Sequence, residues 1–210
     1  MFQVRIHGRG GQGVVTGAEM LSIAAFQGGR HAQAFPSFGS ERTGAPVVAF
    51  CRIDDREIRL REPIMQPDAL IIQDPTLLHQ VDVFSGLKKN GYILINTIHS
   101  FEQLGLGDFV RDFSPDHLLN VGATELALKH VGRAVPNVPL LGAFAAIDST
   151  AALDASQLGP QAARAPWSPG ASRMLQGCPV AQARIKRQQE ATRGNPCSRF
   201  EFTAAVARGW

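Results

Sequence analysis

Three glycines near the N-terminus have the spacing of a phosphate-binding turn. Gly8, Gly10 and Gly13 satisfy the pattern G-x-G-x-x-G and lie between a predicted strand and a predicted helix. Glycines let the backbone turn sharply and approach a phosphate, and the helix that follows offers unpaired N–H groups and the positive end of its dipole. The segment therefore predicts a phosphate site, to which Arg9 adds a positive charge.

The sequence lacks the acid that a dinucleotide site needs. Such a site uses a carboxylate for the ribose hydroxyls about 20 residues after the glycines, at the end of the second strand. Residues 30–36 contain no acid, and the first one after them is Glu41, beyond a proline and a glycine. This argues against an NAD-dependent dehydrogenase. Two interpretations of the glycines stay open: a phosphate ligand of another kind, or close packing without a ligand.

Other residue types give no support for catalysis by this chain alone. His7, beside the glycines, is predicted either to donate to a phosphate or shuttle a proton, or to be a hydrogen-bonded structural histidine. Cys51, Cys178 and Cys197 are too far apart for a CxxC pair or a set of iron–sulfur ligands. No serine lies in a G-x-S-x-G turn. Any metal ion or cluster is therefore expected on another chain.

Composition and charge divide the chain into two parts. Hydrophobic residues make up 44% of the 210 residues and charged residues 19%, as in folded globular proteins. Residues 1–154 hold 13 Lys and Arg against 16 Asp and Glu, a net charge of −3, whereas residues 155–210 hold 8 against 2, a net charge of +6. We predict a domain at 1–154, followed by an atypical basic tail at 155–210 that is extended or partly disordered.

The same observations predict where the protein works. Because the predicted domain is acidic, the overall charge of +3 does not indicate a nucleic-acid partner. The N-terminus has no signal-peptide pattern, and the sequence has no uninterrupted run of about 18 apolar residues. We expect a cytoplasmic protein without membrane contact.

Strand-like and helix-like segments alternate along the predicted domain. The apolar stripe of the first helix suits packing on a sheet, and two short apolar runs indicate buried parallel strands. The predicted strands are residues 2–7, 30–35, 47–51, 57–60, 69–72 and 92–95, with 47–51 and 57–60 as a hairpin, and the predicted helices are residues 14–26, 77–87, 123–131 and 140–147. This order predicts an α/β fold: a Rossmann-like layered sheet, mostly parallel, with helices on both faces and an irregular C-terminal tail.

Four stretches of the predicted domain occur together in one known family. They are HGRGGQG at residues 7–13, AQAFPSFG at residues 32–39 with ER at 41–42 and GAP at 44–46, IRLR at residues 58–61, and the segment from PD at 67–68 to DPTL at 74–77. In order and spacing they resemble the gamma subunit, or pyruvate/ketoisovalerate oxidoreductase gamma region, of pyruvate:ferredoxin-type 2-oxoacid oxidoreductases. A weaker likeness continues to about residue 150.

The resemblance implies a division of labour between chains. In this family a 2-oxoacid is decarboxylated on thiamine diphosphate, electrons leave through iron–sulfur clusters, and coenzyme A takes the acyl group. The implied partners are alpha, beta and ferredoxin-like delta subunits, which are expected to hold the thiamine diphosphate, the Mg²⁺ and the clusters. This chain is expected to bind at most coenzyme A and to be inactive in isolation.

The resemblance also implies which residues contribute to the coenzyme A site. The first loop would meet the phosphates, and the second would face the catalytic assembly. These residues are Gly8, Arg9, Gly10, Gly11, Gln12 and Gly13 in the first loop, and Ser37, Ser40, Glu41 and Arg42 in the second.

Some positions depart from the family pattern and leave alternatives open. Ser40 and Thr43 stand where the family often has proline and arginine, and Gly122 stands where an aspartate is frequent. The 2-oxoacid could therefore be 2-oxoglutarate, or an aromatic one such as phenylglyoxylate, instead of pyruvate. A non-catalytic nucleotide-binding or scaffolding module is the alternative from another class. The basic tail is either an extension that wraps a partner or a frameshifted reading of GC-rich DNA.

Overall fold

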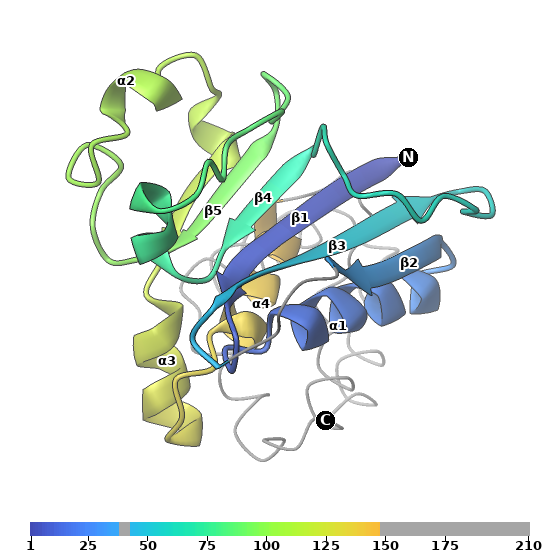
Figure 1. The fold of residues 1–210 in the computed structure, drawn as a ribbon, viewed down its shortest axis with the longest axis horizontal. Helices are drawn as coiled ribbons and strands as arrows, with labels where there is room; N and C mark the ends of the chain where they lie inside the picture. Colours follow the sequence, from blue (N-terminus) through green and yellow to red (C-terminus); the bar gives the residue numbers. More distant parts are fainter. Residues whose placement is uncertain (38–42, 148–210) are drawn as a thin grey trace, which may run out of the picture.

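A six-stranded sheet forms the centre of the fold (Figure 1). The computed structural model describes residues 1–37 and 43–147, so the predicted tail at 155–210 lies outside the described residues. The strands are β1 (Phe2–Arg9), β2 (His31–Pro36), β3 (Pro46–Asp54), β4 (Ala69–Ile72), β5 (Tyr92–Asn96) and β6 (Leu118–Val121). The helices of the described residues are α1 (Val14–Gln27), α2 (Gly107–Val110), α3 (Ala123–Val131) and α4 (Asn137–Ile147), with 3₁₀ helices η1 (Pro75–His79) and η2 (Pro115–His117).

The sheet is mixed, and most of its pairings are parallel. Its strands lie in the order β2-β3-β1-β4-β5-β6; the pairings from β1 to β6 are parallel, and β3 is antiparallel to both β1 and β2. The predicted α/β class is therefore confirmed. The predicted hairpin of residues 47–51 with 57–60 is wrong. Since β3 pairs with β1 along one edge and β2 along the other, it has no free edge for residues 57–60.

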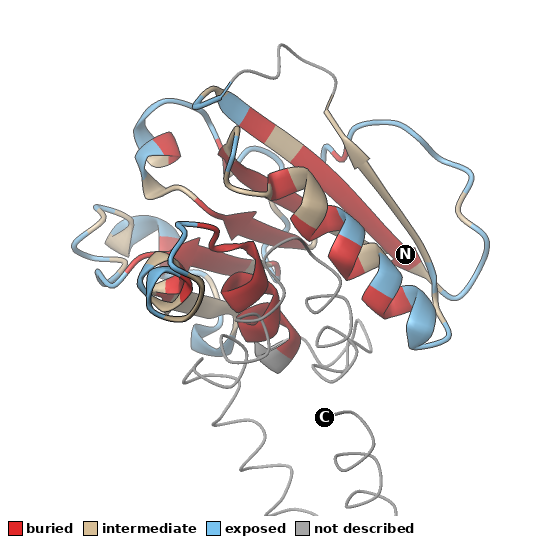
Figure 2. Ribbon diagram, turned by 90° about the horizontal axis from the view of Figure 1, so that it is seen from below, coloured by how far each residue is buried: buried red, intermediate tan, exposed pale blue. Residues whose placement is uncertain are grey.

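One face of the sheet carries the larger hydrophobic core (Figure 2). Side chains alternate across a strand, so Val4 and Ile6 of β1 point toward the same core as Leu21 of α1 and Phe144 of α4. Each such side chain contributes about 1.5–3 kcal/mol when it is fully buried. α4 begins at Asn137, earlier than the predicted 140, because a proline is tolerated in the first turn of a helix. Burial on this face fixes α1 and α4 relative to β1.

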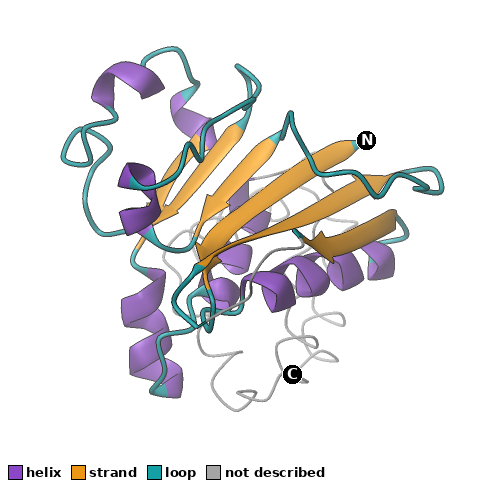
Figure 3. Ribbon diagram, in the orientation of Figure 1, coloured by secondary structure: helices purple, strands orange, loops and turns teal. Residues whose placement is uncertain are grey.

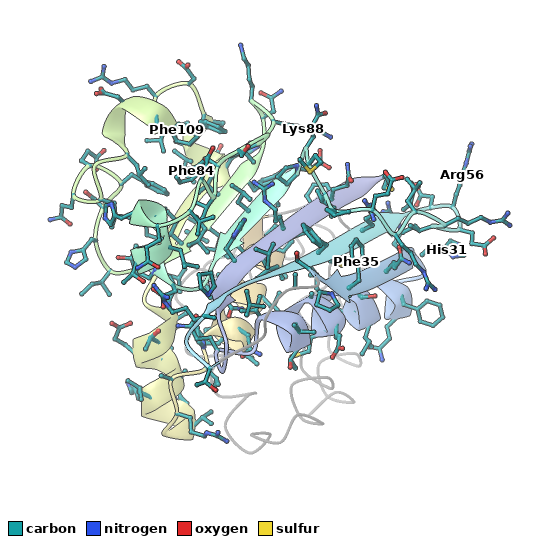
Figure 4. All side chains as sticks on the ribbon, viewed as in Figure 1. His31, Phe35, Arg56, Phe84, Lys88 and Phe109 are labelled. Atoms are coloured by element: carbon teal, nitrogen blue, oxygen red, sulfur yellow. The ribbon has the colours of Figure 1, made fainter. Side chains whose placement is uncertain are left out.

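Shorter elements cover the opposite face of β4 and β5. Ile72 of β4 and Ile95 of β5 pack there with Leu77 of η1 and Val110 of α2. The ring of Phe109 in α2 packs against the ring of Phe84, with the ring centroids 4.5 Å apart (Figure 4). Helices therefore lie on both faces, as predicted.

A buried arginine explains why residues 77–87 do not form the predicted helix. The structure has the short η1 there, followed by turns. Arg5 of β1, only 7% exposed, donates to the carbonyl oxygens of Val83 at 2.9 Å and Ser85 at 2.6 Å. In a helix these carbonyls would instead accept N–H groups four residues further on. The prediction is wrong because a tertiary contact outweighs local helix propensity.

A second buried arginine ties the segment after β3 to the same face. Arg52, 3% exposed, donates to the carbonyl oxygens of Leu60 at 3.2 Å and Glu62 at 2.6 Å. Its guanidinium carbon lies 5.2 Å from the centre of the Phe35 ring, which packs on Phe50 with centroids 5.2 Å apart (Figure 4). Phe35 therefore packs within this domain.

His7 is buried on the same face as Arg5, two residues along β1. Its side chain is 5% exposed, and its Nε2 has no hydrogen-bond partner among the described residues. Burial and the positive charge of Arg5 lower the pKa of His7 to about 4, so the imidazole is neutral near pH 7. Burial therefore favours a structural histidine, but the predicted hydrogen bonding is absent at Nε2 among the described residues.

We expect His7 to make the fold less stable as the pH falls. An unfolded histidine binds a proton near pH 6.5, whereas folded His7 does so only near pH 4, so acid favours unfolding. Stability that is fully present above pH 6.5 is lost between these values, by up to about 3 kcal/mol. Urea unfolding of His7→Gln should show a flatter decline over this range than the wild type. The same change at exposed His79 should leave the decline unaltered; equal slopes for His7→Gln and wild type would contradict the assignment.

Candidate functional site

The carboxyl ends of the four parallel strands meet at one edge of the sheet (Figure 3). In α/β sheets, ligands bind at this edge, at the point where the chain changes the direction in which it adds strands. β1 is such a point, since the chain continues to β2 on one side and later to β4 on the other. The glycine loop, residues 8–13, lies there because it connects β1 to α1.

Different structural constraints apply at the individual glycines of this loop. Gly11 and Gly13 have φ angles of 96° and 76°, in the left-handed region that favours glycine. A Cβ at Gly13 would lie 2.6 Å from Nδ2 of Asn137, and a Cβ at Gly8 would lie 2.6 Å from Cγ2 of Val14. Apart from its two neighbours in the chain, no described residue has an atom within 4 Å of a Cβ at Gly11. Close packing therefore accounts for Gly8 and Gly13, whereas Gly11 borders open space.

The loop leaves several backbone N–H groups open. The N–H of Gly10 donates to the carbonyl of Ala45 at 3.0 Å, but those of Gly11 and Gly13 have no acceptor among the described residues. α1 follows Gly13 without a side-chain cap, so the N–H groups of its first turn are open as well. Left-handed glycines beside a helix N-terminus form a concave surface suited to an anion.

The carboxylate of Asp74, two residues after β4 ends, holds the loop from one side. Its Oδ2 accepts from Nε of Arg9 at 3.1 Å and from Nε2 of Gln12 at 2.9 Å. Its Oδ1 accepts from the N–H of Thr76 at 3.0 Å and from the hydroxyl at 2.6 Å. Burial alone would raise the pKa of Asp74, but the bonds from Thr76 and Gln12 and the charge of Arg9 outweigh it, so the pKa is lowered. Asp74 is therefore ionised near pH 7.

Arg9 is almost fully occupied in this network. In addition to Asp74, it donates through Nη1 to the carbonyl of Gly44 at 3.0 Å, and through Nη2 to Thr76 at 2.7 Å and Gln80 at 2.9 Å. A guanidinium has five N–H donors, and one on Nη1 has no acceptor among the described residues. A direct contact between Arg9 and a phosphate is limited to that donor.

The second predicted loop approaches the same edge of the sheet. Ser37, at its start, donates its N–H to the carbonyl of Val48 at 2.8 Å. At its end, Thr43 forms a bridge with Gly10, and the N–H of Gly44 donates to the carbonyl of Gly10 at 3.1 Å. The other predicted residues of this loop lie outside the described residues: Ser40, Glu41 and Arg42.

Two buried asparagines, to which the sequence assigned no role, fix the helices around the site. Asn137, fully buried at the start of α4, donates to the carbonyl of Gly13 at 3.3 Å. Asn96, at the end of β5, accepts from the N–H groups of Ala123 at 2.9 Å and Thr124 at 3.1 Å, where α3 begins. The sequence signal that could have identified both asparagines is a polar residue at the end of a strand or the start of a helix, since such side chains cap helices.

Neither a metal site nor a reactive thiol accompanies the loop in the described part of the chain. No group of three or more His, Cys, Asp or Glu side chains that could hold a metal ion occurs among the described residues. Cys51 of β3 is fully buried, and this burial raises its pKa to about 12, so it is not a nucleophile. No described helix combines the length and apolar character needed to span a bilayer.

Comparison with known proteins gives consistent matches. The family model described as pyruvate ferredoxin/flavodoxin oxidoreductase matches residues 3–162. Pyruvate synthase subunit PorC of Methanosarcina barkeri is 52% identical over 145 residues, which are 69% of this chain and 76% of that protein. The pyruvate/ketoisovalerate oxidoreductases common subunit gamma of Thermococcus kodakarensis is 45% identical over 157 residues, or 75% of this chain and 83% of that one.

A solved structure agrees with these matches. The crystal structure of pyruvate oxidoreductase subunit PORC from Thermotoga maritima superposes with a TM-score of 0.68 and 32% identity, over 84% of this chain and 94% of that one. The resemblance predicted from the four sequence stretches is thus confirmed. The chain belongs to the pyruvate ferredoxin/flavodoxin oxidoreductase family, as a gamma-type subunit of a 2-oxoacid oxidoreductase complex.

Proposed function

We propose that the glycine loop of this subunit binds a phosphate of coenzyme A. The complex would convert a 2-oxoacid and coenzyme A to acyl-CoA, CO₂ and a reduced acceptor. The observation that carries the proposal is the set of open N–H groups at Gly11, Gly13 and the first turn of α1, at the carboxyl edge of the sheet. Backbone N–H groups and the helix dipole favour an anion there.

The geometry assigns different parts to the predicted residues. Gly11 and Gly13 would donate to the phosphate through their N–H groups, and Arg9 would add the one donor that its network leaves free. Gly8 and Gly10 would allow the loop to pack against α1 and residues 43–45. Ser37, with the loop that follows it, would border the same site.

The proposal extends to the partners and the substrate. We propose that alpha, beta and ferredoxin-like delta subunits in the cytoplasm hold thiamine diphosphate, Mg²⁺ and the iron–sulfur clusters, and that the tail beyond residue 154 is separate from this domain. The names of the relatives favour pyruvate or a branched 2-oxoacid over 2-oxoglutarate or phenylglyoxylate. Rates of the purified complex with each 2-oxoacid would distinguish these substrates.

A scaffolding role without a ligand is the second candidate, and one observation favours it. Gly8 and Gly13 are explained by close packing alone, which would hold whether or not the loop met a phosphate. The two functions differ at Gly11, because its side-chain position meets no packing contact among the described residues. Substitution at Gly11 therefore separates them.

We expect Gly11→Asp to weaken coenzyme A binding far more than Gly11→Asn. Both side chains tolerate the left-handed conformation, have nearly the same size and would enter open space. They differ by one negative charge close to the proposed phosphate. In the assembled complex, the KM for coenzyme A should be about tenfold or more higher for Gly11→Asp than for Gly11→Asn. Equal KM values for the two variants would contradict the phosphate site and favour the scaffold.

We further expect the native protein to purify as part of a larger complex. Native mass spectrometry, with absorbance for clusters and extraction of thiamine diphosphate, should find this chain together with subunits that carry both. Isolated, the chain should show no 2-oxoacid oxidation. A native protein that purifies as a single chain of 22.6 kDa without cofactors would contradict the proposed assembly.

A further inference from the structure

We propose that Asp74 is the positioning residue of the glycine loop, the group that holds it in the shape that receives a phosphate. This inference rests on the proposed function, because it assigns a new residue to the same site. Asp74 would not touch coenzyme A. It would act through Gln12 and Arg9, which its carboxylate joins at 2.9 and 3.1 Å.

Asp74 is itself held in place by its local structure. It caps η1, with Pro75 as the first residue of that helix, and its Oδ1 accepts both the N–H and the hydroxyl of Thr76. β4, which precedes it, is paired with β1 and β5. The side chain of Asp74 is only 13% exposed. The carboxylate is therefore a fixed point at the edge of the sheet.

Gln12 connects the carboxylate of Asp74 to the backbone of the loop. Its Nε2 donates to Asp74, while its Oε1 accepts the N–H of Arg9 at 2.8 Å and would lie 3.1 Å from a Cβ at Gly8. The carboxylate has no donor of its own, so it determines which end of the Gln12 amide points toward β4. This orientation closes the turn from Arg9 to Gln12 and leaves the N–H groups on either side of Gln12 open.

Charge alone would give Asp74 the opposite effect. A carboxylate near a bound phosphate repels it, and Arg9 offsets this only in part. If charge were the main effect of Asp74, its removal would lower the KM for coenzyme A. If Asp74 positions the loop, its removal should raise the KM. The sign of the change therefore separates the two effects.

The test uses Asp74→Asn in the assembled complex, with Asp68→Asn as the matched control. Asp68 directly precedes the same strand at its other end, accepts a backbone N–H from Gln3 at 2.8 Å and pairs with Lys88 at 2.6 Å. Asp74→Asn should raise the KM for coenzyme A about tenfold and change kcat much less, since the charge that strengthens the contacts with Arg9 and Gln12 is lost. Asp68→Asn should leave both constants unchanged. A KM for Asp74→Asn that is equal to or below the wild-type value would overturn the proposal.

A second variant keeps the test decisive if Asp74→Asn does not assemble. Gln12→Leu removes both side-chain hydrogen bonds while Asp74 and its contacts with Thr76 remain. It should raise the KM for coenzyme A by a similar factor, and an unchanged KM would overturn the positioning role. The Gly11 pair separates this failure from failure of the site itself. If Gly11→Asp raises the KM and these variants do not, only the role of Asp74 is lost.

Discussion

The shared carboxylate of Asp74 is the interaction on which the edge of this domain depends. It joins the loop that leaves β1 to the turn that leaves β4, two segments 65 residues apart in the sequence. Arg9 extends the network to residue 44 at the end of the second loop. Because the three segments are linked through one ionised group, the shape of the glycine loop is coupled to the register of β1 with β4.

Different interactions on the two faces of the sheet hold the segments that meet at this edge. On one face, apolar burial holds α1 and α4 against the strands, and Asn137 joins the start of α4 to the carbonyl of Gly13. On the other face, Arg5 and Arg52 replace helix packing with hydrogen bonds to carbonyls of irregular segments. The longer helices α1, α3 and α4 pack on the first face, whereas the short η1, which also begins at the edge, packs on this one.

Local pattern predicted much of this fold, and tertiary contacts explain what it missed. Periodicity and the glycines predicted β1, α1, β4 and β5, because their burial is read directly from apolar spacing. The partners of β3 and the turns after Leu77 depend on distant residues such as Arg5, which no local pattern reveals. In the sequence Asp74 stood out only as the first residue of the DPTL stretch at 74–77. A helix cap followed by proline was visible, but not its contact with Gln12.

Hydrogen exchange of the assembled complex with and without coenzyme A tests the central claim most directly. The open N–H groups of residue 11 and residues 13–16 should exchange quickly without coenzyme A, because they have no acceptor within the loop or helix, whereas the N–H of Gln12 donates to the carbonyl of Arg9. If they bind a phosphate, coenzyme A should slow their exchange while residues 55–66, which lie away from the loop, stay unchanged. Unaltered exchange at residue 11 and residues 13–16, with protection elsewhere in the complex, would show that coenzyme A binds without this loop.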